Sequence, residues 1–276
     1  MRKKLLFVVM ALICSCAALS AQDAQPQETS GRLESGQTWT DKEFVASLDG
    51  TTQRYIEILP EGFDPEKRVD LIVWLHGHGS DRTQTFRERG ECSAPRIIAQ
   101  KYGAILVSPD YRAKTSWMGP AAEADMLQLL ALLKEQYNIG RTIFVGGSMG
   151  GSSLLTFTAL HPDLVDGIVA YNPTANHLEY ENFHEAIAIS FGGVKQDIPL
   201  EFKNRSAEYF PERFTMPMAV TVGGKDTSVP PESVMRLVSI VEKLQPNTWI
   251  RFDPEGGHAT GLEDSLDALE FVFSRL

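Results

Sequence analysis

The chain has 276 residues, of which 43% are hydrophobic, 22% charged and 9% aromatic, and its formal net charge is −10. This balance is typical of a folded globular protein and excludes a disordered, collagen-like or coiled-coil chain. The acidic surface also argues against nucleic acid or an anionic membrane as the main partner, because both need a basic surface.

Residues 1–21 are predicted to form a signal peptide for export. Three basic residues precede an apolar run over 5–12, and small residues continue to Ala21. The run is short for a bilayer, so we expect no membrane span. We expect cleavage after Ala21 and a periplasmic or extracellular protein. A lipid anchor at Cys16 is the alternative, because residues 13–16 loosely resemble a lipobox.

The cysteines support an early cleavage. Cys14 and Cys16 would leave with the signal peptide, so that the mature chain keeps only Cys92 and a net charge of −13. One cysteine cannot form an internal disulfide, and stability must come from the hydrophobic core. Cys92 is interpreted as a partly buried small side chain after a charged loop rather than as a nucleophile.

Residues 22–40 are predicted to be a linker, and residues 41–276 a single domain without internal repeats. Short apolar runs in this domain alternate with segments of helical spacing. Strands are predicted at 54–59, 71–75, 104–107, 142–145, 167–170, 217–222 and 248–252. Helices are predicted at 121–137, 152–160, 232–244 and 262–273. This alternation indicates an α/β fold with a mostly parallel central sheet and helices on both faces, in which functional residues follow the strands.

A serine flanked by glycines follows the strand 142–145. The sequence Gly146-Gly147-Ser148-Met149-Gly150 fits the G-x-S-x-G pattern, a sharp turn that exposes a nucleophilic serine between a strand and a helix. The alternative for such a sequence is a flexible glycine-rich turn. Because strand, turn and helix all fit here, we predict that Ser148 is the nucleophile.

An acid and a base follow the last two strands. Asp226 comes after the strand 217–222, and His258 follows the strand 248–252. A serine hydroxyl needs a base to become a good nucleophile, and the base needs a carboxylate to fix its tautomer. Asp253 and Glu255 are alternative acids, but they lie very close to His258 in sequence, so we prefer Asp226.

The segment 75–80 follows the strand 71–75 and has the sequence Leu-His-Gly-His-Gly-Ser. An acyl-transfer enzyme needs two backbone N–H groups that stabilise the oxyanion. We expect these N–H groups to come from His78 and from Met149, the residue after the nucleophile. His76 and His78 are thin evidence for a metal site, because no cysteine or acidic ligand lies nearby, and we expect neither a metal nor a cofactor.

These four motifs together resemble the α/β-hydrolase superfamily. The resemblance covers residues 54–276 and is nearest to small secreted feruloyl or acetylxylan esterases and to the catalytic domain of prolyl oligopeptidases. It implies a triad of Ser148, Asp226 and His258 with His78 and Met149 at the oxyanion hole. Prolyl oligopeptidases carry a β-propeller ahead of this domain, and the short segment before the first strand leaves no room for one. We therefore expect an esterase.

Residues 174–214 are predicted to form a short cap insertion, because they interrupt the alternation of strands and helices. Its aromatic residues either line a substrate pocket or pin the insertion to the body of the domain. We take His177 and Tyr180 as candidate substrate contacts. Asp110, Arg112 and Trp117, which follow the strand 104–107, are further candidates. Arg112 would bind a substrate carboxylate or belong to a surface ion pair.

The sequence therefore predicts an exported, cofactor-free serine hydrolase that cleaves a carboxylic ester through an acyl-serine intermediate. The substrate is expected to be a small-molecule or carbohydrate-linked ester. The alternatives are a serine peptidase that acts on small peptides and a non-catalytic binding protein on a hydrolase scaffold. A lipase is disfavoured, because the sequence contains no long apolar lid.

Overall fold

The computed structural model describes residues 29–276. The predicted signal peptide and the alternative lipid anchor lie outside these residues. The strands are β1 (Ser30–Arg32), β2 (Thr38–Val45), β3 (Thr52–Leu59), β4 (Val69–Leu75), β5 (Ile105–Pro109), β6 (Ile139–Gly147), β7 (Gly167–Tyr171), β8 (Met218–Gly223) and β9 (Thr248–Asp253). The helices are α1 (Gly90–Tyr102), α2 (Pro120–Gln136), α3 (Met149–Leu160), α4 (His184–Phe191), α5 (Pro199–Asn204), α6 (Glu232–Leu244) and α7 (Leu262–Phe273).

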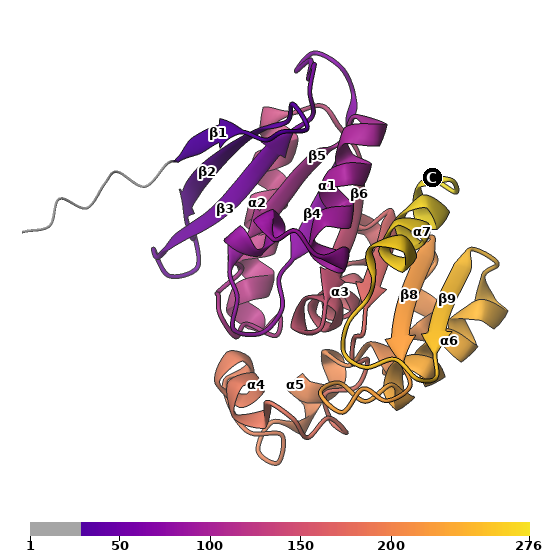
Figure 1. Cartoon of the computed structure of the whole chain (residues 1–276). Helices are drawn as coiled ribbons and strands as arrows, with labels where there is room; N and C mark the ends of the chain where they lie inside the picture. Colours follow the sequence, from indigo (N-terminus) through magenta and orange to yellow (C-terminus); the bar gives the residue numbers. More distant parts are fainter. Residues whose placement is uncertain (1–28) are drawn as a thin grey trace, which may run out of the picture.

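The strands form one sheet in the order β1-β2-β3-β5-β4-β6-β7-β8-β9 (Figure 1). The last six strands in this order, β5-β4-β6-β7-β8-β9, run parallel. Strands β1, β2 and β3 form an antiparallel edge. All seven predicted strands are present. The predicted linker over 22–40 is wrong at its end, because β1 and the start of β2 lie within it. These edge strands bury little surface and carry charged side chains, so the apolar alternation that marks a strand is weak there.

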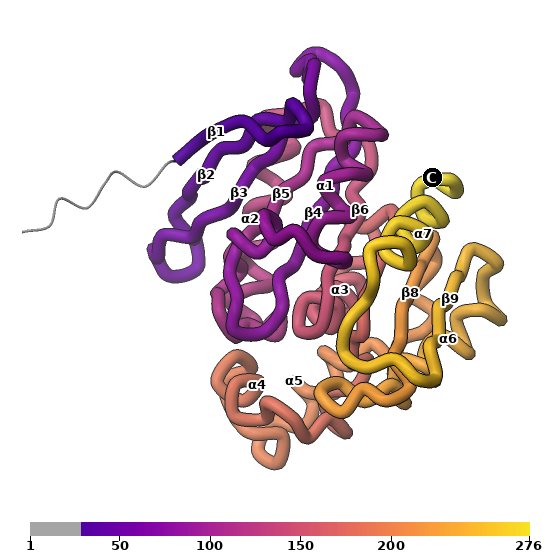
Figure 2. The backbone as a smooth tube through the Cα atoms, in the orientation of Figure 1, coloured from indigo at the N-terminus to yellow at the C-terminus, as the bar shows by residue number. Residues whose placement is uncertain are grey.

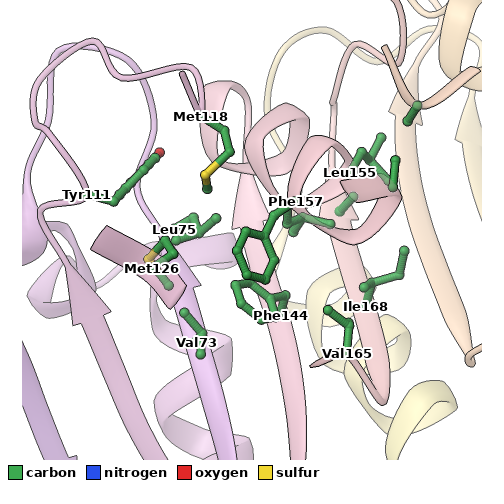
Figure 3. Close-up of a cluster of buried hydrophobic side chains, with 14 of the residues drawn as sticks. Val73, Leu75, Tyr111, Met118, Met126, Phe144, Leu155, Phe157, Val165 and Ile168 are labelled. Atoms are coloured by element: carbon green, nitrogen blue, oxygen red, sulfur yellow. The ribbon is translucent and has the colours of Figure 1, made fainter. Parts of the chain in front are cut away.

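Helices cover both faces of the sheet and create two hydrophobic cores (Figure 1). Helices α1 and α7 pack on one face, against inward residues such as Trp74 and Val145. Helices α2, α3 and α6 pack on the other face. Figure 3 shows part of this second core, where the ring of Phe157 from α3 stacks on that of Phe144 from β6 with ring centroids 5.0 Å apart. Buried cores on both faces explain why the central strands are continuous apolar runs.

Helix α1 and the environment of Cys92 differ from the expectation. Residues 90–102 form a helix that the sequence pattern did not predict, since it begins at Gly90 without a side-chain cap and contains Pro95. Cys92 lies on this helix with 0% of its surface exposed, more deeply buried than expected. Burial raises the pKa of its thiol, which makes Cys92 a poor nucleophile.

The insertion between β7 and β8 contains α4, α5 and two short 3-10 turns, and it lies beyond the carboxyl ends of the strands, at the bottom of Figure 2. Four of its aromatic side chains are buried and fix it to the body of the domain: Tyr180 and three phenylalanines. The phenylalanines are Phe191, Phe202 and Phe214. Phe183, by contrast, is 39% exposed. Among the helices formed by residues 29–276, none has the length and apolar composition needed to cross a membrane.

Candidate active site

Ser148 occupies the sharp turn between β6 and α3. Its φ of 58° and ψ of −122° lie in a region that is unfavourable for a residue with a side chain. The Ser148 N–H donates to the carbonyl oxygen of Tyr171 at 2.8 Å and so holds the turn. A Cβ atom on Gly150 would overlap the carbonyl oxygen of Leu75, so only glycine permits this close approach of helix and strand. The backbone therefore presents the Ser148 hydroxyl at the carboxyl end of the sheet.

His258 lies in the loop after β9 and contacts both other residues of the predicted triad. Its Nδ1 is 2.6 Å from Oδ2 of Asp226, and its Nε2 is 2.8 Å from Oγ of Ser148. Because an ionised carboxylate only accepts hydrogen bonds, the proton resides on Nδ1. The lone pair of Nε2 then accepts the hydrogen bond from the Ser148 hydroxyl, which is the arrangement required for a general base.

Asp226 is held rigidly in the loop after β8. Its side chain is 1% exposed, and Oδ1 accepts hydrogen bonds from the backbone N–H groups of Ser228 and Val229, both at 2.9 Å. The second oxygen is thereby aimed at His258. Neither alternative acid takes this place. Oδ1 of Asp253 accepts from the N–H of Glu255, whose own carboxylate pairs with Lys225.

The loop after β4 supplies backbone N–H groups beside the serine. Within residues 29–276, neither the N–H of His78 nor that of Met149 donates to another group of the chain. Met149 is the first residue of α3, where unpaired N–H groups and the helix dipole favour negative charge. Both N–H groups are therefore free to stabilise an oxyanion.

The ring of His76 lies between backbone carbonyl groups of the chain. The ring nitrogens of His76 lie 2.9 and 3.1 Å from the carbonyl oxygens of Gly77 and Asp110, and burial lowers the pKa of this histidine. Over residues 29–276, no cluster of three or more possible metal ligands occurs.

The loop after β4, called the oxyanion loop below, carries one member of an aromatic cluster. The cluster consists of His78, Trp117, Tyr180 and Phe183. The His78 ring lies 4.3 Å from that of Phe183 and 5.9 Å from that of Trp117, centroid to centroid. The Trp117 indole N–H donates to Nδ1 of His78 at 3.1 Å. Desolvation, followed by the neighbouring His76, lowers the pKa of His78, so the ring is neutral at pH 7. The cluster thus offers an uncharged aromatic surface, of which Phe183 is the exposed part.

Three of the five residues expected to contact the substrate are engaged by other residues of the chain. Arg112 forms ion pairs with Asp49, at 2.7 Å, and with Asp125, which agrees with the ion-pair alternative.

The carboxylate of Asp110 is bound by the backbone N–H and the guanidinium group of Arg82, at 2.9 and 3.1 Å. His177 is 1% exposed and hydrogen-bonded to Thr156 at 3.3 Å.

Trp117 and Tyr180 are also buried, but both support the site. Trp117 packs under His78, and the Tyr180 hydroxyl donates to the carbonyl oxygen of Ser228 at 2.7 Å. Tyr180 therefore connects the cap to the loop of Asp226.

Two polar residues near the site were not found from the sequence. Oε1 of Gln84 accepts a hydrogen bond from the Gly77 N–H at 2.9 Å, and Oε2 of Glu91 accepts one from the Thr260 N–H at 3.0 Å. They hold the loops of His78 and His258, respectively. Gln84 precedes α1 and Glu91 lies in its first turn. The sequence pattern did not predict this helix, and neither residue belongs to a recognisable motif.

Comparisons with known proteins agree with this architecture. A family model described as the prolyl oligopeptidase family matches residues 116–273, more than half of the chain. An S-formylglutathione hydrolase from Agrobacterium tumefaciens superposes with a TM-score of 0.70 at 14% identity, covering 89% of this chain and 98% of that one. For an acetyl xylan esterase from Paenibacillus sp. R4, the TM-score is 0.67 at 15% identity, with 88% and 85% covered.

A larger relative also shares the fold. The acylaminoacyl peptidase of Pyrococcus horikoshii superposes with a TM-score of 0.61 at 16% identity, covering 84% of this chain. The chain spans about 40% of the length of that peptidase. A search of the curated proteins finds no significant match to the sequence. At these identities the superpositions establish a shared fold, and the predicted α/β-hydrolase fold is confirmed.

Proposed function

Because the chain belongs to the prolyl oligopeptidase family of serine hydrolases, we propose that it cleaves carboxylic esters through an acyl-Ser148 intermediate. One observation carries the proposal: the Ser148 hydroxyl donates to His258, which donates to the buried Asp226, beside two free backbone N–H groups. Such a relay activates a serine at neutral pH.

The reaction has two steps. Oγ of Ser148 attacks the ester carbonyl while Nε2 of His258 takes its proton, and Asp226 stabilises the resulting imidazolium. The N–H groups of His78 and Met149 bind the oxyanion of the tetrahedral intermediate. Collapse of this intermediate releases the alcohol, which receives the proton from His258. Water, deprotonated by His258, then attacks the acyl-serine and releases the carboxylic acid and the Ser148 hydroxyl.

The surroundings of Ser148 support an uncharged ester as the substrate. The neutral ring of His78 and the exposed ring of Phe183 form an aromatic surface suited to an acyl or aryl group. Arg112 is fully engaged by two carboxylates and is not free to bind the carboxyl end of a peptide. The predicted signal peptide would place the protein outside the cytoplasm. Its substrate would then be a small-molecule or carbohydrate-linked ester found there.

Cleavage of small peptides is the second candidate function, favoured by the family to which the chain belongs. Turnover of p-nitrophenyl acetate compared with aminoacyl p-nitroanilides separates the two. We expect wild-type kcat/KM to be higher for the ester. A preference for the anilides would replace the esterase proposal by the peptidase one.

We expect Ser148→Ala to lower ester turnover by about a thousandfold or more, because it removes the nucleophile. Ser239→Ala, which alters an exposed serine of α6, is the matched control and should retain wild-type turnover. Wild-type rates in Ser148→Ala would reject the proposed nucleophile.

A further inference from the structure

The side chain of Gln84 is nearly buried and has a fixed orientation. It lies in the 3-10 turn Arg82–Phe86 and is 7% exposed. The Gly77 N–H donates to its Oε1 at 2.9 Å, so the amide nitrogen Nε2 must occupy the opposite side of the carboxamide. Within the part of the chain that the structure describes, this Nε2 donates to no other group. An amide donor that the chain leaves unused is available to a ligand.

The Gln84 amide nitrogen borders a small space above Gly77. A Cβ atom placed on Gly77 would lie 3.6 Å from Nε2 of Gln84, 3.7 Å from the carbonyl oxygen of Gly147 and 3.8 Å from Cβ of Ser148. These are ordinary contacts. Gly77 also lies outside the left-handed region of backbone conformation. Unlike Gly150, it is needed neither to avoid a clash nor to relieve strain, so the space beside Ser148 that its missing side chain leaves would hold a methyl group in ordinary contact.

Peptide geometry places the oxyanion next to Gly77. In a planar trans peptide, the N–H of one residue lies on the same side of the C–N bond as the Cα atom of the residue before it. An oxygen that accepts a hydrogen bond from the His78 N–H therefore lies alongside Cα of Gly77. The Cβ position on the same Cα atom lies 3.8 Å from Cβ of Ser148 and 3.6 Å from the Gln84 amide nitrogen.

We propose that the Gln84 carboxamide is a third hydrogen-bond donor to the oxyanion, next to the N–H groups of His78 and Met149. This inference rests on the proposed function, because it assumes an oxyanion formed by attack of Ser148. The same side chain also positions the oxyanion loop, since its Oε1 holds the Gly77 N–H. A fixed donor binds the developing negative charge more strongly than the neutral carbonyl, so it accelerates the reaction.

Gln84→Glu and Gln84→Met separate the donor from the positioning role. Glutamate keeps an oxygen for the Gly77 N–H but can donate toward the oxyanion only when protonated. Methionine has a similar size and removes both functions. We expect each variant to lower kcat for p-nitrophenyl acetate by about a hundredfold at pH 8, the typical effect of losing one oxyanion donor. Gln128→Glu is the matched control, because Gln128 of α2 likewise accepts a backbone N–H, that of Ser47, at 2.8 Å.

The pH dependence decides whether Gln84 acts as a donor. The ratio of kcat in Gln84→Glu to kcat in the wild type should rise as the pH falls from 8 to 5, because protonation restores a donor and removes the negative charge. The ratio for Gln128→Glu should stay near one. A low but pH-independent ratio for Gln84→Glu would overturn the donor role and leave Gln84 as a positioning residue only.

Gly77→Ala provides an independent test that leaves Gln84 unchanged. The added methyl group makes only ordinary contacts, so the thermal midpoint should stay close to the wild-type value while kcat falls. Wild-type kcat in this variant, or in Gln84→Met, would overturn the proposal. Absence of ester turnover in the wild type itself would overturn the proposed function and the role of Gln84 with it. If the wild type hydrolyses the ester and the variants are equally active, only the role of Gln84 is overturned.

Discussion

At the scale of single residues, burial in a hydrophobic interior lowers the pKa of the His177 imidazole. It is 1% exposed and packs against the rings of Trp117 and Phe191. Desolvation, with a smaller effect of the nearby Arg205, lowers its pKa from 6.5 to about 3. In the unfolded chain the same group takes up a proton near pH 6.5. The contribution of His177 to the free energy of unfolding is therefore complete above pH 6.5, and it is lost as the pH falls toward 3.

We expect His177→Gln to weaken the acid sensitivity of the fold. Between pH 6.5 and 4.5 the wild-type free energy of unfolding should fall more steeply than that of the variant, by about 1.4 kcal/mol per pH unit, the contribution of one proton. Urea unfolding at several pH values measures both slopes. His184→Gln alters an exposed histidine and should follow the wild-type curve. Parallel curves for the wild type and His177→Gln would contradict this explanation.

The positions of Ser148, Asp226 and His258 could be predicted from the sequence, since each lies in a glycine-containing loop directly after an apolar strand. The partners of Arg112 and His177 could not be predicted in this way. Asp49 reaches Arg112 from the hairpin between β2 and β3, and Thr156 reaches His177 from α3. Such contacts depend on the packing of distant elements, which motif spacing does not encode.

At the scale of elements, α1 supports the loop that carries His258. A Cβ atom on Gly90, the first residue of α1, would overlap the carbonyl oxygen of Thr260 and lie 3.0 Å from the carbonyl carbon of Gly261. Glu91, the next residue, accepts a hydrogen bond from the Thr260 N–H at 3.0 Å. The start of this helix thus sets the height of the His258 loop above the sheet. Neither β1 and β2 nor α1 was predicted, because charged edge strands and an uncapped helix lack strong periodic patterns.

Gly90→Ala is expected to displace the His258 loop and to lower kcat for p-nitrophenyl acetate by about tenfold or more, since small misplacement of a catalytic group is costly. The far-ultraviolet circular dichroism spectrum should remain that of the wild type. Gly261→Ala serves as the control: a Cβ atom there meets nothing within 4 Å, so kcat should be retained. Equal kcat values for the two alanine variants would refute the coupling between α1 and this loop.

At the scale of the whole molecule, one sheet between two hydrophobic cores brings together loops that lie more than a hundred residues apart. Ser148 and His258 are separated by 110 positions and are joined by a hydrogen bond of 2.8 Å. The parallel strands β6, β8 and β9 end at the same edge of the sheet, which is why their following loops meet. The alternation of strands and helices was enough to predict this edge. The antiparallel border formed by β1, β2 and β3 depends on weaker patterns and was largely missed.

The central claim is that this arrangement makes Ser148 nucleophilic, and covalent labelling tests it most directly. The folded protein is incubated with a fluorophosphonate at pH 8, and the modified peptide is identified by mass spectrometry. We predict one label per chain, located on Ser148, and loss of labelling in His258→Gln or after unfolding in urea. Labelling of another residue, or an unmodified Ser148 in the folded wild-type protein, would contradict the account.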